Sequence, residues 1–165
     1  MVSNMREWCD QSNTPVGVNP SIPRPTWDTI WMGLARNVGM RSTCMVPNRQ
    51  VGCVIVSDDN TKVLAIGYNG SAKGDDNCCE YTGDEKKMGD SRCTCVHAEQ
   101  NALVKLDTSN PCKKRMYITL SPCSLCYKLI VNAGITEVIY DDEYSVIQLQ
   151  KLVELGVKVK QYENH

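Results

Sequence analysis

The chain has 165 residues, enough for one domain built around a single hydrophobic core. Hydrophobic residues make up 42% of it and charged residues 22%, which is an ordinary globular composition. The net charge is −1 and the pI is about 6.1, so a basic surface for a nucleic-acid polymer is not expected and a small-molecule ligand is favoured.

The ten cysteines are a high count for a chain of this size. In a secreted protein they would suggest disulfides, but no apolar signal segment opens the chain and no run approaches membrane-spanning length. We therefore expect a reducing, cytoplasmic setting in which several thiols bind metal.

Residues 1–25 are polar and rich in proline, which predicts an extended leader before a domain over residues 26–165. Thr26 can cap a first helix. The apolar residues of that helix recur at helical spacing and are expected to face the core: Trp27, Ile30, Trp31, Leu34, Ala35 and Val38. Two β-branched runs, residues 51–56 and 63–68, then predict a hairpin.

The second half alternates helices and strands. The expected elements are a helix over 97–106, a strand over 115–120, a helix over 122–133, a strand over 136–140, a helix over 146–155 and a strand over 157–162. In the first turn of the helix that Pro122 opens, Cys123 and Cys126 would face the same way. This order predicts a three-layer α/β/α sandwich with a mixed five-stranded sheet, parallel in its second half.

Two short motifs carry the chemistry. His97, Cys123 and Cys126 are three ligands suited to tetrahedral zinc, with a fourth position left for water. Glu99 is too close to His97 to be a convenient fourth ligand, but it is well placed to shuttle a proton from that water. A Cys-x-x-Cys pair alone is as often a structural zinc site or a redox pair. The His-x-Glu and Pro-Cys-x-x-Cys motifs together match the signature of zinc-dependent deaminases.

From residue 25 to residue 162 the chain resembles the deoxycytidylate (dCMP) deaminases of the cytidine deaminase superfamily. The resemblance rests on Arg41–Cys44, Arg49–Cys53, Gly67–Gly70, His97–Glu99 with Asn101 and Ala102, Thr119–Cys123, Asn132–Ile135 and Tyr144. The Gly-Tyr-Asn-Gly run distinguishes this family from free-nucleoside and transfer-RNA adenosine deaminases. Cys53 departs from the family, which usually has Ala beside the base pocket, and this thiol could affect substrate selectivity.

The resemblance implies a cytidine deaminase-like fold and hydrolysis of dCMP to dUMP and ammonia, which supplies dUMP for thymidylate synthesis. It also implies a homo-hexamer that dCTP activates and dTTP inhibits, through a separate nucleotide site with a magnesium ion. The family's effector site is built around a glycine-rich segment, here Gly70, Ser71, Lys73 and Gly74, whose backbone N–H groups could hold a phosphate.

For the substrate, Asn69 is expected to hydrogen-bond the deoxyribose or to support the base, as the family's loop does, although an Asn before Gly is also a plain turn. The backbone from Thr119 to Ser121 is expected to meet the amide edge of the base. Arg49 and Tyr144 are candidates for the phosphate end, and Arg49 could equally be a solvated loop charge.

The other cysteines suggest a second, structural zinc. Members of the family place ligands at positions matching Cys44, Cys78 and Cys93, and the fourth ligand could be Cys95 or Cys79. Such a site would pin the long loop from residue 71 to 96 onto the body of the domain. The alternative is that these cysteines are small buried hydrophobic residues.

Three other functions remain open. The first is a deaminase that acts on dCTP, or on both dCMP and dCTP, with the same zinc site and a different phosphate pocket. The second is a zinc-binding interaction module without activity, which Glu99 argues against because a structural site needs no acid–base carboxylate. The third is nucleic-acid editing, which the acidic charge balance disfavours.

Overall fold

The computed structural model describes residues 24–76 and 95–163. Nearly all of the expected leader therefore lies outside the described residues, as do Cys78, Cys79 and Cys93. The elements, in chain order, are α1 (Trp27–Gly39), β1 (Gly52–Ser57), β2 (Val63–Tyr68), α2 (Ala98–Leu103), β3 (Lys114–Leu120), α3 (Cys126–Asn132), β4 (Ile135–Asp142), α4 (Val146–Glu154) and β5 (Lys158–Gln161).

The sheet has five strands in the order β2-β1-β3-β4-β5. β1 is antiparallel to both of its neighbours, β2 and β3, whereas β3–β4 and β4–β5 are parallel pairs. The sheet is thus mixed, and its second half is parallel, as the order of the predicted elements requires.

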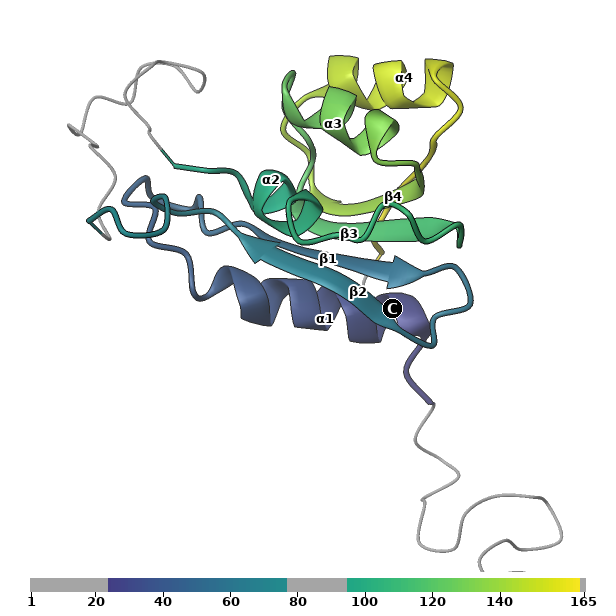
Figure 1. Ribbon diagram of the computed structural model, residues 1–165, viewed down its shortest axis with the longest axis horizontal. Helices are drawn as coiled ribbons and strands as arrows, with labels where there is room; N and C mark the ends of the chain where they lie inside the picture. Colours follow the sequence, from purple (N-terminus) through teal and green to yellow (C-terminus); the bar gives the residue numbers. More distant parts are fainter. Residues whose placement is uncertain (1–23, 77–94, 164–165) are drawn as a thin grey trace, which may run out of the picture.

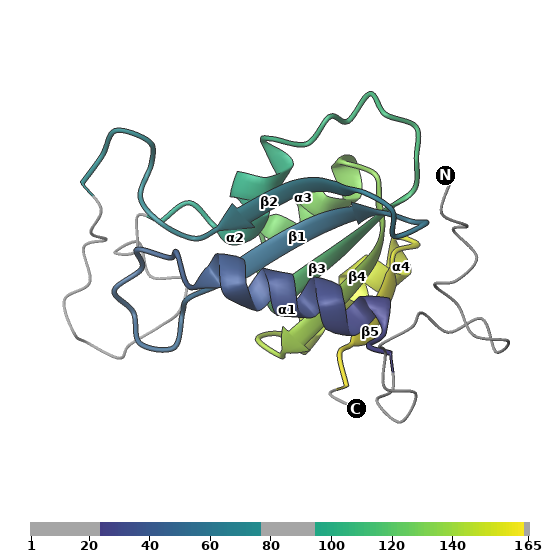
Figure 2. The same ribbon diagram turned by 90° about the horizontal axis from the view of Figure 1, so that it is seen from below.

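The helices cover the two faces of this sheet unequally. α1 lies along one face, and α2, α3 and α4 lie on the other (Figure 1, and seen from below in Figure 2). A smaller core cluster lies between α1 and the sheet, around Met32, Val54 and Tyr117. A larger cluster on the opposite face includes Ile118 and Ile130. The predicted three-layer α/β/α sandwich is confirmed.

The predicted buried face of α1 is confirmed for Trp31, Leu34, Ala35 and Val38 and is wrong for the other two residues. Thr26 does cap the helix, with its hydroxyl oxygen accepting from the Thr29 N–H at 3.1 Å. However, Trp27 and Ile30 are 49% and 40% exposed, while Met32 is fully buried. Asp28 lies on the side of α1 that meets the sheet and accepts a hydrogen bond at 2.8 Å from the hydroxyl of buried Tyr117.

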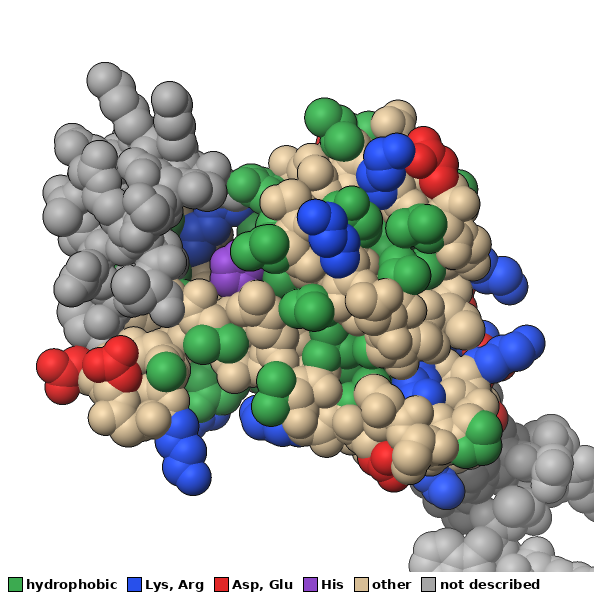
Figure 3. All heavy atoms as spheres, turned by 45° about the horizontal axis from the view of Figure 1, so that its top comes forward, with side chains coloured by type: hydrophobic (Ala, Val, Ile, Leu, Met, Phe, Trp, Pro, Cys, Tyr) green, Lys and Arg blue, Asp and Glu red, His purple; other side chains and the backbone are tan. Residues whose placement is uncertain are grey.

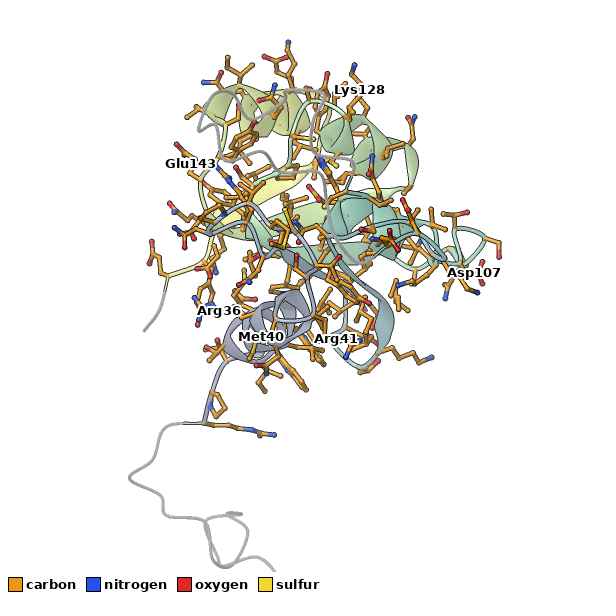
Figure 4. The ribbon with its side chains drawn as sticks, turned by 90° about the vertical axis from the view of Figure 1, so that its left-hand side faces the viewer. Arg36, Met40, Arg41, Asp107, Lys128 and Glu143 are labelled. Carbon is orange, nitrogen blue, oxygen red and sulfur yellow. The ribbon has the colours of Figure 1, made fainter. Side chains whose placement is uncertain are left out.

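The exposed indole of Trp27 stacks on that of Trp31, which packs against the core beneath α1, with ring centroids 5.4 Å apart. At the other end of the helix, Arg36 reaches Asp141 at the end of β4, with donor–acceptor distances of 2.7 and 2.9 Å (Figure 4). α1 is therefore fixed to the sheet by polar contacts near both ends as well as by its apolar residues.

The predicted strands lie within two residues of the observed ones, but β4 is longer than expected and continues to Asp142. This extension matters because Asp142 pairs with Leu120, the last residue of β3, just before the second metal motif. Within the described residues, no helix is long and apolar enough to cross a membrane.

Candidate metal and substrate site

His97 lies immediately before α2 and acts as the N-cap of that helix. Its backbone N–H donates to the Gln100 side-chain oxygen at 2.8 Å, which completes a capping box. α2 runs only from Ala98 to Leu103, so the predicted helix over 97–106 is too long at both ends. The His-x-x-Gln spacing is a capping signal that could have placed this start from the sequence.

The two cysteines come from the connection between β3 and α3. α3 begins at Cys126 and not at Pro122, so the predicted helix start is wrong and Cys123 lies in the preceding turn. The Tyr127 N–H nevertheless bonds the Cys123 carbonyl at 3.1 Å, which is the spacing of a helical turn. As expected, both thiols face the same way: each sulfur lies 3.4 Å from His97 Nδ1.

These three side chains have the spacing that a zinc ion requires. Their ligand atoms all lie within 4.8 Å of one another. Bonds of about 2.1 Å to nitrogen and about 2.3 Å to sulfur at a tetrahedral angle would place nitrogen and sulfur about 3.6 Å apart. Figure 3 shows a histidine side chain, in purple, at the surface of this face beside hydrophobic side chains. The donor set fits zinc, with one coordination position left for water.

The electrostatics of the cluster favour a thiolate at Cys123. Hydrogen bonds from Cys126 and His97 hold the pKa of the Cys123 thiol well below its ordinary value, although burial opposes them. The hydrogen bond to Cys123 and burial raise the pKa of Cys126. The hydrogen bond to Cys123 also raises the pKa of His97. Because metal ligands bind in their deprotonated form, a pre-formed thiolate suits this site.

Glu99 lies in the first turn of α2 and is only 4% exposed. Burial raises its pKa to about 7, and the nearby charge of His97 offsets only part of that effect. A carboxyl group with a pKa near neutrality can both accept and donate a proton. Cys53 on β1 is fully buried in the same core cluster as Ala98, so a thiol lies under this part of α2.

The side chain of Asn69 is buried and holds the loop that carries Arg49. Its oxygen accepts from the Val51 N–H at 2.8 Å and from the Ser42 hydroxyl at 2.7 Å, and its nitrogen donates to the Arg49 carbonyl at 2.6 Å. One amide N–H is left for a ligand, whereas the oxygen already accepts two hydrogen bonds.

Asn101, one turn into α2, donates to the Tyr68 carbonyl at 2.8 Å. This contact joins α2, the helix that follows His97, to Tyr68, the residue before Asn69. The motif predicts an asparagine at position 101, but no sequence pattern reveals that its side chain binds the last carbonyl of β2.

Ser121 is 3% exposed and lies directly after β3. Its hydroxyl oxygen accepts from the N–H groups of Tyr144 and Ser145, at 2.7 and 3.2 Å, and its own N–H donates to the Asp142 carbonyl at 2.8 Å. Ser121 thus joins the turn that carries Cys123 to the connection between β4 and α4.

The structure brings Arg49 and Tyr144 together, although they are far apart in the sequence. The Arg49 guanidinium lies over the Tyr144 ring, 5.4 Å from its centroid, and both residues are half-buried. Among the residues that the structure describes, Arg49 makes no ion pair with a carboxylate. A guanidinium ordered on an aromatic ring without a carboxylate partner is suited to binding an anionic group.

The candidate effector segment is attached directly to the metal motif. Gly70 and Val96 exchange two backbone hydrogen bonds, at 2.8 and 3.1 Å, and Val96 is the residue before His97. The Ser71 N–H donates to the Thr43 hydroxyl at 3.2 Å, and the Ser71 hydroxyl oxygen is buried without a hydrogen-bond partner among the described residues. Lys73 and Gly74 are exposed.

Two of the cysteines expected to bind a structural zinc lie together. Cys44 and Cys95 are each 8% exposed and form one small cluster, with Val46 packed against it. The other candidates, Cys78, Cys93 and Cys79, lie outside the described residues. The clustering is compatible with both readings of these cysteines, as zinc ligands and as buried hydrophobic residues.

A mixed sheet with one helix on one face and three on the other, and with a His/Cys/Cys group where α2 and α3 begin, defines a cytidine deaminase-like protein. Residues 25–141 match the model of the cytidine and deoxycytidylate deaminase zinc-binding region. The chain therefore belongs to the deoxycytidylate deaminase family, as its resemblance predicted.

The relatives and solved structures that the chain resembles agree with this assignment. A deoxycytidylate deaminase of Mycobacterium phage D29 is 35% identical over 74% of this chain and 99% of its own. The human deoxycytidylate deaminase is 38% identical over 72% of this chain and 66% of its own. A crystal structure of the dCMP deaminase of cyanophage S-TIM5 with dCMP and dUMP superimposes with a TM-score of 0.70, at 32% identity, over 86% of this chain and 100% of that one.

The chain spans about half the length of two yeast relatives with the same name, 46% of the one from Saccharomyces cerevisiae and 47% of the one from Schizosaccharomyces pombe. Their identities to this chain are 37% and 34%.

Proposed function

We propose that this protein converts dCMP to dUMP and ammonia by hydrolysis. The observation that carries the proposal is the cluster of His97, Cys123 and Cys126. The buried carboxyl group of Glu99 lies two residues after His97, in the first turn of α2. Support comes from the cyanophage enzyme of similar structure, which was crystallised with dCMP and dUMP.

In the proposed mechanism, His97 Nδ1 and the sulfurs of Cys123 and Cys126 would hold a zinc ion. Bound zinc supplies Lewis-acid activation of water. Glu99 would take one proton from the attacking water and pass it to N3 of the cytosine ring, while the oxygen of the water forms a bond to C4. Glu99 would then move the second proton, from the hydroxyl formed at C4, to the amine, so that the bond from C4 to nitrogen breaks and ammonia leaves. Burial of Glu99 suits this cycle, because a carboxyl group whose pKa is about 7 changes protonation state at little cost near neutral pH.

At the other end of the substrate, the Arg49–Tyr144 pair is proposed to bind the phosphate. The remaining N–H of Asn69 is proposed to meet the deoxyribose, while its other groups hold the Arg49 loop. The backbone from Thr119 to Ser121 is proposed to border the base. These contacts would favour a nucleotide over a nucleoside, because the phosphate meets a charge that no described carboxylate neutralises.

The finer features of the family are proposed as well. They are a structural zinc held by Cys44 and Cys95 with Cys78 and Cys93, a homo-hexameric assembly, a role in supplying dUMP for thymidylate synthesis, and opposing control by dCTP and dTTP with a magnesium ion. The Gly70–Val96 pair supports the last of these, since a ligand on the segment from Gly70 to Gly74 would act one residue from His97.

Ammonia release from dCMP, dCTP, deoxycytidine, cytidine and single-stranded DNA, measured side by side, tests the function. We expect turnover of dCMP to be fastest. Comparable or faster turnover of dCTP would favour the alternative, a deaminase of dCTP or of both nucleotides. Activity confined to single-stranded DNA, or no activity by the zinc-loaded protein, would overturn the proposal.

A further inference from the structure

Ser121 lies beside the metal motif, but its hydroxyl binds the connection between β4 and α4. Its oxygen accepts hydrogen bonds from two backbone N–H groups, those of Tyr144 and Ser145. With the side chain only 3% exposed and two donors already bound, this hydroxyl has little capacity for a direct contact with substrate.

The connection that Ser121 holds is short and lacks a local cap. β4 ends at Asp142 and α4 begins at Val146, with Ser145 as its N-cap. The Ser145 side chain does not cap the helix, because its hydroxyl bonds the Gln148 side chain instead. Ser121, from another part of the chain, instead supplies an acceptor for the N–H groups of Tyr144 and Ser145, the two residues that precede α4.

Tyr144 is the residue of this connection that faces the proposed phosphate site. Its ring supports the Arg49 guanidinium, whereas Glu143 beside it is exposed and projects outward (Figure 4). The Tyr144 N–H donates to the Ser121 hydroxyl at 2.7 Å, and this hydrogen bond fixes the position of the Tyr144 ring relative to Cys123, which is two residues after Ser121. Ser121 therefore connects the proposed metal ligand Cys123 to the Arg49–Tyr144 pair that is proposed to bind the phosphate.

Resting on the proposed function, we propose that Ser121 is a positioning residue for the nucleotide phosphate. It acts through Tyr144 and Arg49, and it makes the enzyme selective for a substrate whose phosphate lies at one fixed distance from the deaminated carbon. Its backbone, which borders the proposed base site, is not altered by changes to the hydroxyl, so the two contributions can be separated by mutation.

The test is steady-state kinetics with dCMP, and zinc content, for Ser121→Ala, Arg49→Ala and the double variant. Ser121→Ala leaves two backbone N–H groups without their acceptor, so we expect KM for dCMP to rise about tenfold while kcat stays within about threefold. The zinc content should not change. In the double variant KM should equal that of Arg49→Ala, because both changes disable the same contact.

Two further variants separate this role from general destabilisation. Ser121→Thr keeps the hydroxyl and should restore KM to within about threefold of the wild-type value. Ser145→Ala removes the neighbouring hydroxyl, which bonds Gln148, and should leave KM unchanged.

An unchanged KM in Ser121→Ala would overturn the inference. So would loss of zinc, a fall in kcat as large as the rise in KM, or independent effects that multiply in the double variant. Failure of the proposed function would look different, since the wild-type protein itself would then not turn over dCMP.

Discussion

Gly67 on β2 lies directly against the first turn of α2: a Cβ built on Gly67 would stand 2.2 Å from the Ala98 carbonyl oxygen. The same atom would be 2.5 Å from the Ala102 nitrogen. The bare backbone of Gly67 therefore lets the helix that bears Glu99 rest on the sheet, and no other residue type fits there without moving that helix.

Gly67→Ala should push α2 away from β2 and lower both stability and zinc affinity. Overpacking of this kind typically costs about 1–3 kcal/mol. The matched control is Gly33→Ala on α1, where nothing lies within 4 Å, and there the change should stabilise the protein by about 0.5–1 kcal/mol. Urea unfolding measures both variants. Equal midpoints for Gly67→Ala and the wild type would show that α2 does not depend on this contact.

Glu99→Gln should give a folded, zinc-loaded protein with almost no turnover. A general acid–base group contributes about 10²–10⁴-fold, and one used at several steps should lie near the upper end. Glu154→Gln, an exposed change at the end of α4, should keep the wild-type rate. If Glu99→Gln retained more than about a tenth of the wild-type rate, the proton-shuttle role would be wrong.

Elemental analysis of the pure protein should find close to two zinc ions per chain. His97→Ala should lose one of them, since it removes one of three ligands in the catalytic cluster. Cys112→Ala, a change at a half-buried thiol outside both proposed sites, should keep both. A zinc content near one ion per chain in the wild type would contradict the second site and indicate that Cys44 and Cys95 are buried hydrophobic residues.

The hydrogen bonds of Asp28 make stability dependent on acid pH. Burial alone would raise the pKa of Asp28, but the hydrogen bonds from Lys160 and Tyr117 outweigh it, so the pKa lies below 3.8. A carboxyl group with a depressed pKa stabilises the folded state fully above its unfolded pKa, and this contribution is lost as pH falls through the folded pKa. The stability difference between wild type and Asp28→Asn should therefore shrink between pH 5 and pH 2, as urea midpoints would show. A difference independent of pH would contradict this.

The proposed regulation predicts that dCTP and dTTP shift the dCMP saturation curve in opposite directions. The physical reason is the double hydrogen bond between Gly70 and Val96, through which a ligand on the glycine-rich segment would bias the position of His97. Initial rates measured with and without each triphosphate test it, with consumption of dCTP followed in parallel. Superimposable curves would mean that the chain catalyses without this control.

The sequence predicted the sheet well because its strands are short β-branched or alternating runs between turns. All five strands, their mixed directions and the three-layer arrangement are confirmed. The helices were harder. Amphipathic spacing predicted α1 and most of its buried face, but it could not reveal that Asp28 faces inward to reach Tyr117 or that Trp27 and Ile30 stay exposed.

The metal cluster was predictable because its motif fixes both residue types and spacing, and the structure does bring His97, Cys123 and Cys126 together. The contacts of Ser121 and Asn69 were not predictable in the same way. Their partners are backbone groups of Tyr144, Arg49 and Val51. Because nearly every residue type carries these backbone groups, the sequence does not show which residue will be the partner.

The order of strands has a consequence for how the protein folds. The β1–β2 hairpin is local, but the β1–β3 pairing at the centre of the sheet must close a loop that spans residues 58–113 and contains α2. His97 lies within that loop, and both cysteine ligands lie beyond it. The three ligands meet only after this slow, long-range step. A zinc ion bound by these three ligands would therefore bind late in folding, and we expect it to slow unfolding without speeding the formation of the sheet.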